Sequence, residues 1–156
     1  MSLQEIKIFL KQKLASKIDA VELSSLMGML IEAVTGWNRM EQIVNVNTEL
    51  SKEQQAQIEQ YAEQLLSGKP IQYILGKAWF MGNELMVNEH VLIPRPETEE
   101  LVEWIISYAN IMNKTLSIID IGTGSGCIPI ALKLALPLCN LTGLDISKEA
   151  LAVAEI

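Results

Sequence analysis

The sequence predicts an α/β protein with an N-terminal all-α domain, on the basis of three observations. Over residues 1–68, apolar side chains recur at helical spacing behind helix-start signals. Short runs of aromatic and branched residues broken by glycine then follow, which is typical of a β-hairpin. Finally, two short apolar runs alternate with two helical patterns around a glycine-rich turn. That alternation is typical of the first part of a parallel sheet with helical crossovers.

The helical part carries its own start and stop signals. Leu23–Val34 contains an apolar face that Gly36 ends, and a short helix is expected after Trp37. We expect four helices in a small bundle over residues 1–68, which buries its own core. At three of the helix starts, a capping residue is followed three positions later by Glu or Gln. These pairs are Ser2 with Glu5, Asp19 with Glu22, and Ser51 with Gln54.

A β-hairpin linker is expected over residues 69–94. The helical period is lost at Ile71, and the pattern from there predicts short strands. Gly82 lies in a predicted turn near Met81–Asn83. Pro94 and Pro96 then end the extended segment.

Residues 95–156 are expected to form the N-terminal part of a second, Rossmann-like domain. A helix is predicted over Glu97–Asn110, with Leu101, Trp104, Ile105 and Tyr108 on one face. Strands are predicted at Leu116–Ile121 and Leu141–Asp145, with a helix between them and another after the second strand.

The turn between these strands contains glycine at every second position, at Gly122, Gly124 and Gly126. A glycine-rich turn before a helix directs backbone N–H groups toward a ligand. The spacing differs from the dinucleotide fingerprint, because the third glycine comes one position early. Asp120 lies at the end of the preceding strand, where its carboxylate repels a pyrophosphate and suits a cationic amino group.

A second acid, Asp145, ends the next strand and can accept the two hydroxyls of a ribose. The two strand-end acids together predict a site for a nucleoside that carries an ammonium group and no phosphate. S-adenosylmethionine fits that description. The alternative is that the glycines only form a tight turn, and a glycine triplet alone does not exclude it.

This stretch resembles motifs I and II of class I S-adenosylmethionine-dependent methyltransferases. The chain is also similar to the HemK/PrmC family, whose members methylate the glutamine amide in the Gly-Gly-Gln loop of peptide-chain release factors. The run Pro-Arg-Pro-Glu-Thr-Glu is the most specific element of the resemblance. The residues that carry it in the middle of the chain are Gly68, Pro70, Gln72, Tyr73, Ile74, Gly76, Phe80, Gly82, Val87, Leu92–Pro96, Glu97, Thr98 and Glu99.

The resemblance implies roles for particular residues. Arg95 and Pro96 are expected to shape the substrate entrance, and the helical bundle over residues 1–68 to recognise the release factor. The cofactor-binding residues are expected to be Asp120, Gly122, Thr123, Gly124, Ser125, Gly126, Asp145 and Ile146. The family orients its acceptor amide with an Asn-Pro-Pro-Tyr motif, but no Asn-Pro pair occurs here. The catalytic residues are therefore unknown, and we expect a fragment that is inactive by itself.

Composition bounds the remaining interpretations. The 156 residues carry a formal net charge of −7, which argues against direct binding to nucleic acid. The sequence shows neither a secretory leader nor a membrane span, so Cys127 and Cys139 indicate a cytoplasmic protein with reduced thiols. Amide methylation needs no covalent intermediate, so we do not expect Cys127 to be a nucleophile. His90 is the only histidine, and no metal site is expected.

Two alternative functions stay open. An adenine-amino methyltransferase of nucleic acid uses a similar motif on a planar amino group, although the acidic charge weighs against it. A non-catalytic module, whose helical part docks a partner protein, is the other.

Overall fold

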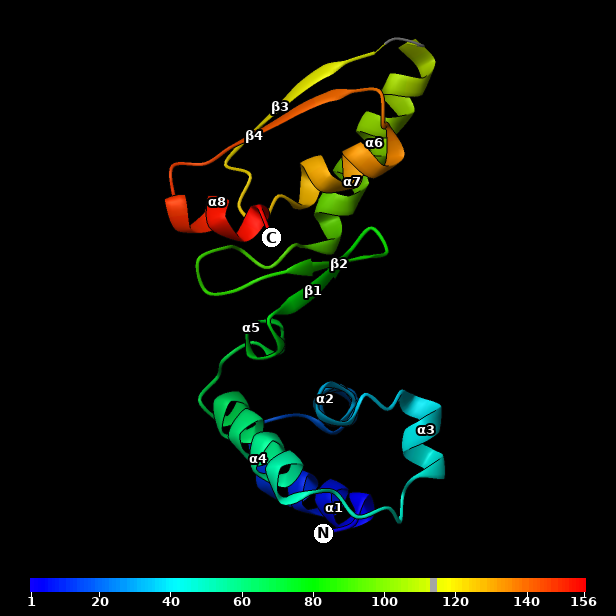
Figure 1. Ribbon diagram of the computed structural model, residues 1–156, viewed down its shortest axis with the longest axis vertical. Helices are drawn as coiled ribbons and strands as arrows, with labels where there is room; N and C mark the ends of the chain where they lie inside the picture. Colours follow the sequence, from blue (N-terminus) through cyan, green and yellow to red (C-terminus); the bar gives the residue numbers. More distant parts are fainter. Residues whose placement is uncertain (113–114) are drawn as a thin grey trace. The chain divides into compact units, whose positions relative to one another are not determined.

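The computed structural model describes residues 1–112 and 115–156. It divides into two compact units, Met1–Leu75 and Gly76–Ile156, which are described separately (Figure 1). The first unit contains helices and one isolated β-bridge, between Ser2 and Glu49. The second contains a two-stranded hairpin and a two-stranded parallel sheet with helices. Within the described residues, no helix has both the length and the apolar character needed to cross a membrane.

The helical unit begins its helices where the capping pairs predict. Ser2 and Ser51 each form a complete capping box, and Asp19 accepts hydrogen bonds from two backbone N–H groups of the following turn. Gly36 ends its helix with a left-handed φ of 74°. The helices are α1 (Leu3–Leu14), α2 (Ala20–Thr35), α3 (Arg39–Val44), α4 (Lys52–Leu66) and α5 (Ile71–Leu75).

One apolar core holds this unit together. Leu3, Leu10, Leu30 and Ile58 are fully shielded from solvent, and they come from α1, α2 and α4. Each fully buried side chain of this size contributes about 1.5–3 kcal/mol relative to an exposed one. The bundle therefore has the core that the helical periodicity predicts.

Residues 71–75 correct the expectation that strands start at Ile71. They form helix α5, in which Ile71 and Ile74 are buried. The N–H groups of Tyr73 and Ile74 both donate to the carbonyl of Pro70, which closes a helical turn. Gly76, with a φ of 72°, ends it before the first strand. Burial of the two isoleucines favours the helix. The strand propensity of this short apolar run therefore predicted the wrong element.

The predicted hairpin turn is confirmed. Strand β1 (Lys77–Phe80) pairs antiparallel with β2 (Asn83–Met86), and Phe80 lies opposite Asn83. Only Met81 and Gly82 connect the strands, with φ values of 50° and 74°. Positive φ at both central residues is the geometry of a type I′ turn, which matches the twist of paired strands.

The second unit continues in the expected order of helix, strand, helix, strand and helix. The elements are α6 (Pro96–Met112), β3 (Ser117–Ile121), α7 (Cys127–Ala135), β4 (Asn140–Leu144) and α8 (Lys148–Ala154). Strands β3 and β4 run parallel, with Asp120 opposite Gly143. Helices α6 and α7 pack together, and α7 also packs against β4 (Figure 1).

The packed face of α6 differs from the expected one. Val102 and Ala109 are buried, and Val102 joins Phe80 and Leu132 in the core of the second unit. Trp104 and Tyr108, expected on the packed face, are 74% and 54% exposed. Helical spacing predicted an apolar stripe on α6. It did not predict which side of that stripe packs against α7.

Candidate functional site at the glycine turn

The turn between β3 and α7 depends on glycine for its backbone conformation. Gly122, Gly124 and Gly126 have φ values of 81°, 55° and 75°. L-residues with a side chain rarely adopt this left-handed region, whereas glycine enters it without a steric cost. The alternating glycines of the sequence thus correspond to three left-handed backbone positions after the carboxyl end of β3.

Three N–H groups of this turn bond to the end of β4, and a fourth bonds within the turn. Gly122 N and Thr123 N both donate to the carbonyl of Leu144, at 2.7 and 2.9 Å. Gly124 N donates to Asp145 Oδ2 at 2.9 Å, and Gly126 N donates to the carbonyl of Thr123. The expectation that these groups point at a ligand is therefore corrected. Three of these four N–H groups fasten the turn to the neighbouring strand, and that of Gly126 closes the turn itself.

Asp145 lies directly after β4, at the same end of the sheet. Its Oδ1 accepts a hydrogen bond from Ser147 N at 2.9 Å, and its Oδ2 accepts the bond from Gly124 N. The N–H groups of Ser147 and Gly124 lower the pKa of this carboxyl, so it is ionised at neutral pH. Each oxygen keeps a further lone pair. The carboxylate can therefore accept ribose hydroxyls while it holds the turn.

Asp120 supplies the second acid of the site. It follows Ile119 in β3, and its Oδ2 is buried without a hydrogen-bond partner among the described residues. Burial of an unpaired polar atom is unfavourable, and a bound cationic donor would relieve it. This observation fits the ammonium group of S-adenosylmethionine.

Cys127 begins α7, close to Asp120. Burial raises the pKa of its thiol, and this outweighs the hydrogen bond with Ser125, which lowers the pKa. A thiol in these surroundings stays protonated and is a poor nucleophile. The expectation that Cys127 is not a nucleophile stays a prediction.

Other predicted site residues lie around the turn or apart from it. Ser125 is buried within it, and Ile146 is fully exposed beside Asp145. Arg95 is exposed just before α6, which begins at Pro96. No hydrogen bond or ion pair between described residues joins Arg95 to the turn, so its place at a substrate entrance stays a prediction.

Sequence reasoning missed the part that Glu99 plays beside that segment. Its Oε1 accepts a hydrogen bond from Met81 N at 2.6 Å, which ties the hairpin turn to the first turns of α6. Met81 needs this partner because its own N–H lies outside the hairpin ladder. The acidic residues after Pro96 indicate possible hydrogen-bond acceptors, but the sequence does not show that Met81 N is the donor.

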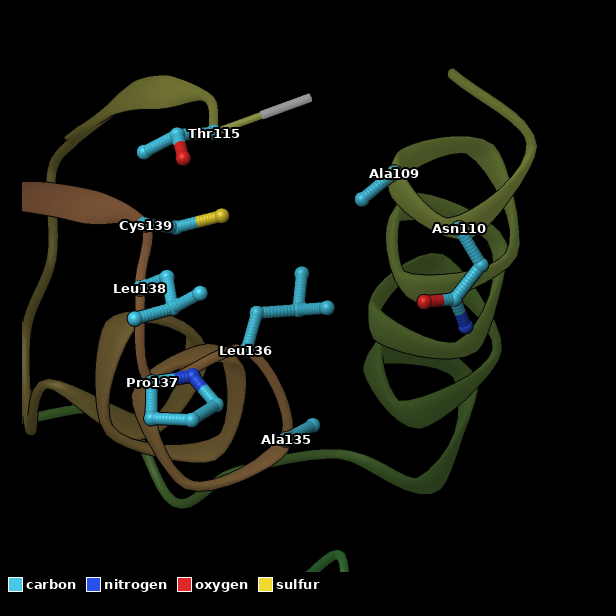
Figure 2. Close-up of a pocket in the computed structure, with 8 residues that line it drawn as sticks. All are labelled: Ala109, Asn110, Thr115, Ala135, Leu136, Pro137, Leu138 and Cys139. Carbon is cyan, nitrogen blue, oxygen red and sulfur yellow. The ribbon is translucent and has the colours of Figure 1, made fainter. Parts of the chain in front are cut away.

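A hollow of about 310 Å³ lies at the opposite end of the same sheet (Figure 2). Its lining comes from the end of α6, from Thr115, and from the connection between α7 and β4. Cys139 and Thr115 precede the strands, whereas ligands of open parallel sheets bind at the carboxyl ends. This hollow therefore contains none of the residues of the candidate site. Among the described residues, no group of three acids, cysteines or histidines is placed to hold a metal ion.

The two units together define a helical domain followed by the start of an α/β methyltransferase fold. Residues 3–76 match the family model of the PrmC N-terminal domain. This match confirms the resemblance of the chain to the HemK/PrmC family.

Individual relatives extend the match beyond the helical unit. The chain is 45% identical over 146 residues to the release factor glutamine methyltransferase of Flavobacterium psychrophilum, covering 92% of this chain and 51% of the relative. The proteins of the same name from Enterococcus faecalis and Streptococcus pneumoniae are 44% and 48% identical, over 77% and 72% of this chain. They are covered over 43% and 40% of their own lengths. The chain thus spans about half the length of the curated relatives that it matches.

Proposed function

We propose that the protein transfers a methyl group from S-adenosylmethionine to the glutamine amide of the Gly-Gly-Gln loop in peptide-chain release factors. The relatives' names support the reaction, and one structural observation carries the cofactor assignment. Two strand-end acids, Asp120 and Asp145, flank a turn in which four N–H groups are bonded within the protein. Such a site offers carboxylates for an ammonium group and a ribose, and few free donors for phosphate.

The chain's own residues have the following roles in this proposal. Asp120 holds the ammonium group, since its buried Oδ2 has no other partner among the described residues. Asp145 accepts the ribose hydroxyls with its remaining lone pairs. Gly122 and Gly124 let the nucleoside approach the backbone, because no Cβ occupies the open space beside them. The bound cofactor supplies an electrophilic methyl group.

Rate enhancement of such a transfer rests on aligning the acceptor nitrogen with the methyl group and the sulfur. Alignment of this kind contributes about 7–11 kcal/mol in favourable cases. The 156 residues contain no Asn-Pro pair, and we assign none of them to orienting the acceptor amide.

The helical unit is assigned to recognition of the release factor. Helix α3 presents three apolar side chains to solvent, with Met40, Ile43 and Val44 exposed by 70%, 61% and 80%. Exposed apolar side chains gathered on one short helix are typical of a protein-binding surface. We call these three residues the α3 patch. Both cysteines are free thiols, which supports a cytoplasmic site of action.

The test is a transfer assay with the full-length protein and S-adenosylmethionine labelled in its methyl group. Purified release factor and an adenine-containing DNA duplex are offered in parallel. Label in the Gly-Gly-Gln peptide, absent when that glutamine is replaced by alanine, is the expected result. Label in the DNA would favour the adenine-amino methyltransferase. Cofactor binding without label in either acceptor would favour a non-catalytic module.

A further inference from the structure

The side chain of Thr123 occupies the space beside Gly143, where other residues carry a Cβ. An ideal Cβ on Gly143 would lie 2.9 Å from Thr123 Oγ1 and 3.1 Å from its Cγ2. Packed atoms do not approach so closely, so any side chain at this point of β4 forces Thr123 to move. Gly143 has no positive φ that demands glycine. Glycine is therefore required at position 143 only because it leaves space for the Thr123 side chain.

The contact of Thr123 with Gly143 depends on shape and not on polarity. Thr123 is only 6% exposed, and its Oγ1 is buried without a hydrogen-bond partner among the described residues. That same Oγ1 is the atom nearest to the missing Cβ of Gly143, so it faces the strand and not the solvent. An unpaired buried hydroxyl contributes packing and no net hydrogen-bond energy.

Movement of Thr123 would be passed on to the whole turn. Its N–H donates to the carbonyl of Leu144 at 2.9 Å, and its own carbonyl accepts from Gly126 N at 2.9 Å. Gly143 is also the register partner of Asp120. A side chain at Gly143 therefore disturbs the turn and the strand end that bears the unpaired carboxylate.

We propose that Gly143 is a positioning residue for the glycine turn. By lacking a side chain, it lets Thr123 seat against β4, and this contact holds Gly122–Gly126 in place before a ligand binds. The expected effect on S-adenosylmethionine rests on the proposed function. The effect on the order of the ligand-free turn does not.

The experiment compares Gly143→Ala with Thr142→Ala in the full-length protein. Thr142 is the preceding residue of β4 and is exposed, so its truncation removes no contact with the turn. Amide hydrogen exchange is measured without ligand, and the dissociation constant for S-adenosylmethionine is measured by calorimetry. Gly143→Ala is expected to speed exchange at Gly122–Gly126 and to weaken binding by about tenfold, as overpacking does. Thr142→Ala is expected to change neither.

Two further variants separate shape from polarity. Thr123→Val keeps the shape without the hydroxyl, so ligand-free exchange at Gly122–Gly126 should stay within about twofold of the wild type. Thr123→Ala is combined with Gly143→Ala in a double variant. It removes the two atoms closest to the new Cβ at position 143, so the double variant should regain part of the affinity that Gly143→Ala loses. Thr123→Val remains informative if Gly143→Ala fails to fold.

Unchanged exchange in Gly143→Ala, or a large increase of exchange in Thr123→Val, would overturn the proposal. If the wild type binds no S-adenosylmethionine but exchange still rises in Gly143→Ala, the proposed function fails and the positioning role stands.

Discussion

Asp145 Oδ2 accepts a hydrogen bond from Gly124 N at 2.9 Å, so the acid that ends β4 holds the turn that follows β3. Its other oxygen accepts from Ser147 N, at the start of α8. One carboxylate thus links the glycine turn, strand β4 and helix α8. The stability of the turn and the affinity of the cofactor are therefore expected to change together when this residue is altered.

Replacement of Asp145 by asparagine tests this double role. The amide keeps one acceptor oxygen and loses the other, so either Gly124 N or Ser147 N is left without its partner. We expect S-adenosylmethionine affinity to fall by about tenfold or more, as for lost hydrogen bonds to a charged group. Wild-type affinity in calorimetry would refute the assignment of Asp145.

The same residue predicts a pH dependence of stability. Hydrogen bonds from Ser147 N and Gly124 N lower the pKa of Asp145 in the folded state, relative to its ordinary value of 3.8. The contribution of this carboxylate is therefore fully present above that value and is lost as the pH falls through the folded pKa. The difference in Tm between wild type and Asp145→Asn should shrink toward acid pH. A difference that is constant from neutral to acid pH would show that the lowered pKa is not a source of stability.

Gly126 and Gly28 form a matched pair for substitution by alanine. A Cβ on Gly126 would lie 3.2 Å from both Ala154 Cβ and Ile130 Cδ1, on a backbone with a φ of 75°. Gly28 lies inside α2, where a Cβ meets nothing within 4 Å. Gly126→Ala should lose about 1–2 kcal/mol in the free energy of unfolding, whereas Gly28→Ala should gain about 0.5–1 kcal/mol. Denaturant titration measures both, and equal effects would contradict the strain assigned to the turn.

The bond from Met81 N to Glu99 Oε1 predicts that Glu99 holds the hairpin. Glu99→Ala should destabilise the protein by about 1.5 kcal/mol and expose the Met81 amide to hydrogen exchange. Glu99→Gln keeps an acceptor oxygen and should lose less. Glu100→Ala, at the exposed neighbouring position, is the control. Slow exchange at Met81 in Glu99→Ala would show that the bond does not hold the turn.

Ile43 in the α3 patch tests the role of the helical unit. Ile43→Glu places a charge in an exposed apolar surface, so it should raise the KM for release factor and leave the affinity for S-adenosylmethionine unchanged. Ile8→Glu is the control, because Ile8 is 51% exposed on α1, outside the patch. An unchanged KM in Ile43→Glu would remove the patch from the recognition surface.

The sequence predicted those features that local chemistry determines. Ser2, Asp19 and Ser51 start helices because capping depends on residues three positions apart. The hairpin turn at Met81 and Gly82 and the strand–turn–helix order around Gly122–Gly126 are local in the same sense.

Features that depend on distant neighbours were not predictable in this way. Residues 71–75 form a helix because Ile71 and Ile74 find buried positions, against the propensity of the run. The bonds from the turn to Leu144 and Asp145 exist only once β4 lies beside β3. The contact of Thr123 with Gly143 has the same origin, because no spacing rule connects the two positions.

Calorimetric titration of the full-length protein with S-adenosylmethionine, with nicotinamide adenine dinucleotide in parallel, tests the central claim most directly. The claim is that Asp120 and the internally bonded turn select an ammonium-bearing nucleoside over a phosphorylated one. It predicts that S-adenosylmethionine binds and that the dinucleotide does not. It also predicts that Asp120→Asn weakens the binding of S-adenosylmethionine by about tenfold. Binding of the dinucleotide, or an affinity for S-adenosylmethionine that Asp120→Asn leaves unchanged, would contradict it.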